Sequence, residues 1–115
     1  MVSYNKEQAV GDDQCNVLTI AMHQFDFDVN EAMSWASERH FSLQNEFLAL
    51  MKVVPRFSPE VNKELDEYIT GVANWARATA CWNFECKRYF GEMGLKVMQT
   101  REVPMLAKVG AGILH

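Results

Sequence analysis

Two oxygen-bearing side chains, Ser3 and Glu7, lie four residues apart near the start of this 115-residue chain. If this segment is helical, both residues lie on one face, because positions i and i+4 are about one turn apart. A hydroxyl and a carboxylate together suit a hard cation such as Mg²⁺, which prefers oxygen ligands. The same spacing is common on solvated helix faces, so the pair indicates a metal site only if its surroundings also do.

Groups that could bind a phosphate occur in two other places. Arg88 is followed by Tyr89, and a guanidinium beside a phenol hydroxyl can donate several hydrogen bonds to phosphate oxygens. Lys6 adds a positive charge next to Glu7. Trp82 precedes Arg88 by six residues, and its ring could either pack in a core or stabilise a cation with its face. Taken singly, each of these residues also has an ordinary structural interpretation.

Glycine and capping residues divide the first part of the chain into short helices. Residues 1–10 read as the end of a helix that stops at Gly11, a residue that tolerates the left-handed conformation. Asp12 or Asp13 can then cap a second helix that continues to about Met22.

A longer helix is expected from 28 to about 53. Asp28 and Glu31 form a D-x-x-E capping box at its start, and Pro55 prevents its simple continuation. Apolar residues recur at helical spacing along it, with His40 filling one position. This stripe consists of Ala32, Ala36, Leu43, Phe47, Leu50 and Met51.

A second long helix begins at the sequence Ser58-Pro59-Glu60, where serine caps, proline suits the first turn and glutamate favours the helix dipole. It should run to about Trp82. Its stripe consists of Val61, Leu65, Tyr68, Ile69, Val72 and Ala76. From Lys87 onward we expect irregular structure with at most one short turn. No strand alternation occurs, so the predicted fold class is all-α.

Composition excludes several classes of protein. The chain is 49% hydrophobic and carries a formal charge of -4, which argues against nonspecific nucleic-acid binding. No apolar run approaches the ~18–20 residues of a membrane span. The three cysteines form no paired framework, and the three histidines (His23, His40 and His115) have no zinc spacing. Reduced thiols point to a cytoplasmic protein.

Together these motifs resemble the C-terminal part of a class I terpene synthase, closest to the fungal sesquiterpene cyclases. The family's metal motif reads N-D-x-x-S-x-x-x-E, and Met1 stands at its third position, so the Asn and Asp of the motif are missing from this sequence. The stretch from Gly11 to His23 and the stretch W-N-F-E-C-K-R-Y-F-G near the end also match. The resemblance covers residues 1–108, with a tail over 109–115.

The resemblance implies roles for six residues. Ser3 and Glu7 would be two ligands of a Mg²⁺ ion. Lys6, Arg88 and Tyr89 would contact the substrate diphosphate, and Trp82 would line the cavity. The sequence Asp12-Asp13-Gln14-Cys15-Asn16 imitates the family's aspartate-rich metal motif, but that motif lies upstream of the Ser/Glu helix, so helix capping is the simpler interpretation of the two aspartates.

The implied fold is an incomplete set of C-terminal helices from the terpene synthase bundle. The implied activity is ionisation and cyclisation of a prenyl diphosphate, with farnesyl diphosphate as the expected substrate. With only part of the metal site, the 115 residues alone should be inactive, and their apolar faces should promote self-association. Two alternatives stay open: a non-enzymatic all-α interaction protein or homodimer, and a gene model that starts at the wrong Met.

Overall fold

The computed structural model describes residues 2–110, and within this range all regular secondary structure is helical, with no strand. The helices are α1 (Tyr4–Val10), α2 (Val17–Phe25), α3 (Val29–Met51), α4 (Pro59–Glu85), the 3₁₀ turn η1 (Gly91–Met93) and α5 (Gly94–Thr100). The predicted all-α class is therefore confirmed. None of the helices in the described range is long and apolar enough to cross a membrane.

Local capping places the ends of most helices where the sequence predicts them. Gly11 ends α1 with φ of 75°, and its N–H donates to the carbonyl of Glu7. Asp28 and Glu31 form the complete capping box at the start of α3. The Ser58 hydroxyl accepts from the N–H of Val61 at the start of α4. α3 ends at Met51 rather than near Val53.

The expected start of α2 was wrong. Its cap is Asn16, whose side chain accepts from the N–H of Leu18, rather than Asp12 or Asp13. Asp13 instead accepts a 2.7 Å hydrogen bond from the Thr19 hydroxyl. The helix then runs to Phe25, three residues beyond the predicted end.

The last part of the chain is also more regular than predicted. α4 continues to Glu85, and η1 and α5 follow where irregular structure was expected from Lys87 onward. α5 begins at Gly94, where an added Cβ would lie 1.7 Å from the carbonyl oxygen of Phe84. The missing side chain therefore lets α5 pack directly on the end of α4.

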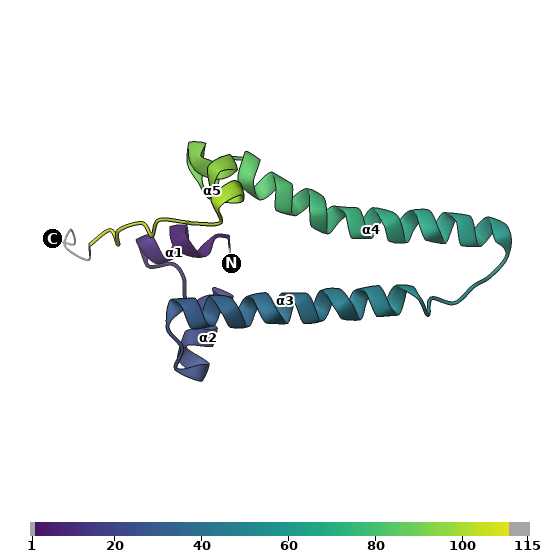
Figure 1. Cartoon of the computed structure of the whole chain (residues 1–115), viewed down its shortest axis with the longest axis horizontal. Helices are drawn as coiled ribbons and strands as arrows, with labels where there is room; N and C mark the ends of the chain where they lie inside the picture. Colours follow the sequence, from purple (N-terminus) through teal and green to yellow (C-terminus); the bar gives the residue numbers. More distant parts are fainter. Residues whose placement is uncertain (1, 111–115) are drawn as a thin grey trace.

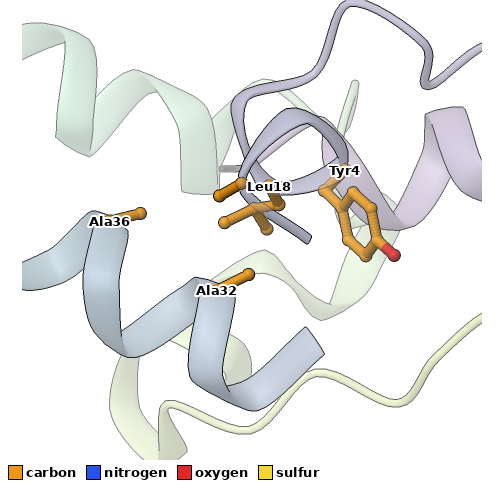
Figure 2. Close-up of a cluster of buried hydrophobic side chains, with 5 residues drawn as sticks. Tyr4, Leu18, Ala32 and Ala36 are labelled. Carbon is orange, nitrogen blue, oxygen red and sulfur yellow. The ribbon is translucent and has the colours of Figure 1, made fainter. Parts of the chain in front are cut away.

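A small core joins α1, α2 and α3. Leu18 is fully buried, and Tyr4 and Ala32 pack around it with two further alanines, Ala21 and Ala36. Figure 2 shows Leu18 lying between Tyr4 on one side and the α3 alanines on the other. Small residues on α3 allow α2 to approach closely. The core thus holds the helix that carries Ser3 and Glu7.

The two long helices bury little of their apolar stripes. Figure 1 shows α3 and α4 as two arms of a hairpin joined by residues 52–58, in a molecule 67 × 33 × 30 Å in extent. Of the α3 stripe, only Ala32 and Ala36 are buried, and α4 has no buried residue. The two stripes therefore do not form a bundle within one chain, and the expected exposed apolar faces are present.

The chain returns to its start after α5. Residues 101–110, which we name the C-terminal strap, run without helix along α1 (Figure 1). The N–H of Val109 donates to the carbonyl of Ala9 over 2.7 Å. This contact with α1 involves Val109, which lies beyond the domain boundary predicted at residue 108. The boundary itself stays a prediction. Residues 111–115 of the predicted tail, including His115, lie outside the described residues.

Candidate functional site

Ser3 and Glu7 converge on one partner, the carboxamide of Asn16. The Asn16 Nδ2 atom lies 2.8 Å from Glu7 Oε2 and 3.4 Å from Ser3 Oγ. Ser3 occupies the cap position of α1, yet its side chain caps no backbone N–H. Its hydroxyl is therefore turned to the same place as the Glu7 carboxylate. The shared helix face predicted from their spacing is formed.

Asn16 is the site residue that sequence reasoning missed. Its Oδ1 atom accepts from the N–H of Leu18 over 3.0 Å, so the amide nitrogen must be the atom that faces Ser3 and Glu7. The residue is buried, with 7% of its surface exposed. One side chain thus caps α2 and orients both candidate ligands. Asn16 ends the sequence Asp12-Asp13-Gln14-Cys15-Asn16, but the capping of α2 was predicted for one of the two aspartates.

Hydrogen bonding controls the charge of Glu7. The Asn16 amide first, and the Ser3 hydroxyl second, hold the pKa of the Glu7 carboxyl below its ordinary value. Donors to a carboxylate favour its ionised form. Because the pKa of Glu7 is lower in the folded than in the unfolded chain, these hydrogen bonds stabilise the fold fully only at a pH above the pKa of Glu7 in the unfolded chain. This stabilisation is lost as the pH falls through the folded pKa. These hydrogen bonds therefore favour the anionic form of Glu7, which is the form that binds a cation.

Substituting Asn16 should test this arrangement. Asn16→Ser keeps a good helix cap but removes the amide that reaches Glu7. Asn16→Asp keeps the cap and places a like charge beside Glu7. We expect the pKa of Glu7 to rise in the order wild type, Asn16→Ser, Asn16→Asp, measured by carbon-detected NMR titration of the carboxyl group. A Gln14→Ser variant, at an exposed position of the same loop, should leave the pKa unchanged. Equal pKa values in all four proteins would contradict the role of Asn16.

Arg88, Tyr89 and Trp82 form a second group at the end of α4. The Arg88 Cζ atom lies 5.7 Å from the centre of the Tyr89 ring. That ring meets Trp82 edge to face, with centroids 6.3 Å apart. Lys87 and Gly91, both with positive φ, bound the tight loop that carries the pair. The Arg-Tyr pair and Trp82 are thus brought together, although they are separate in the sequence.

The Trp82 ring is not a core residue in this chain. Half of its surface is exposed, and its contact with Tyr89 is at the surface. Of the two interpretations open from the sequence, packing inside this chain's core is excluded. Arg88 is exposed as well, so its guanidinium is free to reach an anion.

The two groups of site residues do not contact each other. The side chains of Ser3 and Glu7 both accept hydrogen bonds from Asn16. In the other group, the Tyr89 ring contacts both Arg88 and Trp82. Lys6 is exposed on α1 beside Glu7. Surface hollows along α4 and at the start of α3 include none of these residues. Within residues 2–110 the structure therefore contains two part-sites rather than one closed pocket.

The donor atoms near Asn16 fit a hard divalent cation in part. A hydroxyl and an ionised carboxylate are oxygen ligands of the kind that Mg²⁺ takes together with waters. No group of three His, Cys, Asp or Glu side chains converges anywhere in the described part of the chain. A soft-metal site is thus not supported there, and Asp12 and Asp13 do not join Glu7 in a cluster.

The first part of the chain matches a known metal-binding family. A family model described as terpene synthase family 2, C-terminal metal binding, matches residues 1–46, which include Ser3, Glu7 and Asn16. Sesquiterpene synthase 14 of Postia placenta (strain ATCC 44394 / Madison 698-R) is 54% identical over 109 residues, which are 95% of this chain and 31% of that protein.

Two synthases of a named product are also similar. Delta(6)-protoilludene synthase 8 of Postia placenta is 44% identical over 94% of this chain and 31% of its own length. A delta(6)-protoilludene synthase of Stereum hirsutum (strain FP-91666) is 41% identical over 95% of this chain and 31% of its own length. The chain thus spans about a third of the length of the relatives it matches. From the matched metal-binding region, the all-α fold and these identities, the chain belongs to the fungal sesquiterpene synthase family and corresponds to a C-terminal part of it.

Proposed function

We propose that these residues form the C-terminal part of a Mg²⁺-dependent sesquiterpene synthase, a carbon–oxygen lyase that ionises and cyclises farnesyl diphosphate with loss of diphosphate. The observation that carries the proposal is the convergence of Ser3, Glu7 and Asn16 within the region that matches the metal-binding family model. The names of the relatives support the sesquiterpene class. A metal cofactor is supported by the family description, and Mg²⁺ by the hard oxygen donors.

In this proposal each group has a distinct task. Ser3 and Glu7 would hold the cation, which when bound would supply positive charge to stabilise the departing diphosphate. Asn16 keeps both ligands oriented and Glu7 ionised. These three residues act through oxygen and amide groups whose positions are set by α1 and the start of α2.

The loop after α4 would provide the second half of diphosphate binding. Arg88 offers planar N–H donors to phosphate oxygens, Tyr89 adds its hydroxyl, and Lys6 contributes a positive charge from α1. Trp82 and the Tyr89 ring present aromatic faces and edges beside the loop. Such faces can stabilise a carbocation and exclude water from it. We also propose that the protein lies in the cytoplasm.

A chimera is the experiment that tests the function. The matching 31% of sesquiterpene synthase 14 is replaced by this chain, and Mg²⁺-dependent products from farnesyl diphosphate are read by gas chromatography. We expect turnover by the chimera and none by the 115 residues alone. Glu7→Gln and Arg88→Ala should each lower kcat about a hundredfold or more, because each removes charge that acts on the diphosphate or its metal.

Matched controls exist on α4. Glu64→Gln and Arg77→Ala change the same residue types at exposed positions, and both should leave turnover near that of the unchanged chimera. Turnover that is insensitive to Glu7→Gln and Arg88→Ala would overturn the assignment of these residues. A hydrocarbon product from the isolated chain would overturn its expected inactivity.

A non-enzymatic interaction protein or homodimer is the competing proposal. The observation that favours it is the exposure of the apolar stripe on α4, where Val61, Tyr68 and Val72 are 47%, 70% and 42% exposed. Exposed apolar faces of this kind mark surfaces that are covered by another chain or segment. A chimera without turnover, together with a stable dimer of the isolated chain in sedimentation, would favour this alternative.

A further inference from the structure

The face of α1 that points away from the candidate ligands carries two buried carboxamides. Asn5 and Gln8 are 9% and 5% exposed, so they are among the few buried polar residues in the described structure. They lie three residues apart and share a helix face that is turned away from the face of Ser3 and Glu7. The short helix α1 thus has a ligand-bearing side and an amide-bearing side.

Both carboxamides bind the backbone of the C-terminal strap. Asn5 donates through Nδ2 to the carbonyl of Pro104 over 2.9 Å and accepts through Oδ1 from the N–H of Leu106 over 2.8 Å. Gln8 donates through Nε2 to the carbonyl of Leu106 over 2.8 Å. The same Nε2 atom lies 3.3 Å from Asn5 Oδ1, so the two side chains also fix each other. We name these two residues the amide clamp.

The clamp replaces the hydrogen bonds that a sheet or helix would otherwise supply to this segment. The strap is neither helix nor strand, and side chains of α1 pair the carbonyl of Pro104 and both the N–H and the carbonyl of Leu106. A buried amide without a partner costs about 1–3 kcal/mol, so the strap and the clamp residues depend on one another. The backbone contact from Val109 to Ala9 extends the attachment along the whole of α1.

We propose that Asn5 and Gln8 are positioning residues, which use the C-terminal strap to hold α1 so that Ser3 and Glu7 face the metal. The metal in this inference rests on the proposed function. The attachment of the strap to α1 does not, because the hydrogen bonds themselves show it. α1 has only seven residues, too short to be stable alone. It is held on one side by Tyr4 in the core and on another by the strap. The C-terminal strap therefore contributes to the position of α1.

Hydrogen exchange tests the attachment without any need for turnover. In the double variant Asn5→Leu/Gln8→Met, which keeps the side chains at similar size, we expect the Leu106 N–H and the amides of α1 to exchange about tenfold faster or more. Amides in α4 should be unaffected. A chain ending at Val103 should show the same increase in α1, which separates loss of the strap from damage to α1. Gln24→Met, at an exposed position of α2, is the control and should change nothing.

The positioning role is tested in the chimera. The double variant should raise the half-saturating Mg²⁺ concentration about tenfold, as loss of support around metal ligands typically does, with little change in KM for farnesyl diphosphate. Unchanged exchange in α1, in either the double variant or the shortened chain, would overturn the inference. Faster exchange with an unchanged Mg²⁺ requirement would overturn it too, because the attachment would then not serve the metal. Failure of the unsubstituted chimera to turn over would count against the proposed function alone.

Discussion

Leu18→Ala is expected to destabilise the junction of α1, α2 and α3 by about 3 kcal/mol, within the range of about 2–5 kcal/mol seen for such truncations. Leu18 is the largest fully buried side chain, and the buried core around it otherwise consists of Tyr4 and three alanines. Alanine in its place leaves a cavity that Ala21, Ala32 and Ala36 are too small to fill. Tyr4 would lose its main apolar neighbour, and α1 would lose its position.

Urea unfolding followed by circular dichroism at 222 nm measures this effect. Ile20→Ala is the matched control, because Ile20 lies two residues away on α2 and is 48% exposed. Surface substitutions of this kind change the free energy of unfolding by only about 0.5 kcal/mol. A loss of stability that is the same in both variants would show that the cluster around Leu18 does not hold the three helices together.

Gly94→Ala is expected to displace α5 from the end of α4 and to cost about 3 kcal/mol or more, at the upper end for overpacking. The added Cβ would lie 1.7 Å from the carbonyl oxygen of Phe84 and 2.8 Å from its carbonyl carbon. Both atoms are backbone, so no side-chain rotation relieves the clash. The stacked rings of Phe84 and Phe90, with centroids 5.3 Å apart, should separate at the same time.

Gly71→Ala provides an internal control for the glycine effect. Gly71 lies inside α4, and a Cβ added there meets nothing within 4 Å. Alanine is favoured over glycine inside a helix by roughly 0.5–1 kcal/mol, so this variant should be more stable than the wild type. Opposite shifts in the urea midpoint for the two variants are expected. A stabilised Gly94→Ala protein would mean that α5 does not pack against α4 as the structure has it.

Features that depend on neighbouring residues were predictable from the sequence. Gly11, Asp28 and Ser58 act on backbone groups within three or four residues of themselves, so their types alone predict the ends of α1 and the starts of α3 and α4. Where several neighbouring residues could cap the same helix, their types alone do not predict which one does. The sequence suggested Asp12 or Asp13 as the cap of α2, whereas in the structure Asn16 is the cap and Asp13 accepts from Thr19.

The candidate site was predictable only in part. The spacing of Ser3 and Glu7 predicts a shared face, and the resemblance assigns that face a metal, but nothing local indicates that Asn16 donates to both. The roles of Lys6, Arg88, Tyr89 and Trp82 stay predictions, although the last three do lie together. Their grouping depends on the loop between Lys87 and Gly91, whose conformation the sequence did not indicate.

By itself, the sequence determined that this protein is all-α, that several of its helices begin and end near particular caps, and that the oxygen-bearing side chains of Ser3 and Glu7 share one face. Those properties follow from interactions within a turn or two of chain. Only the tertiary structure decided that Gly94 lies against Phe84, that the stripe of α4 stays uncovered, and that Asn5 and Gln8 clamp the strap. The physical reason is distance along the chain: Asn5 and Leu106 are 101 residues apart, and no local pattern records a hydrogen bond between them.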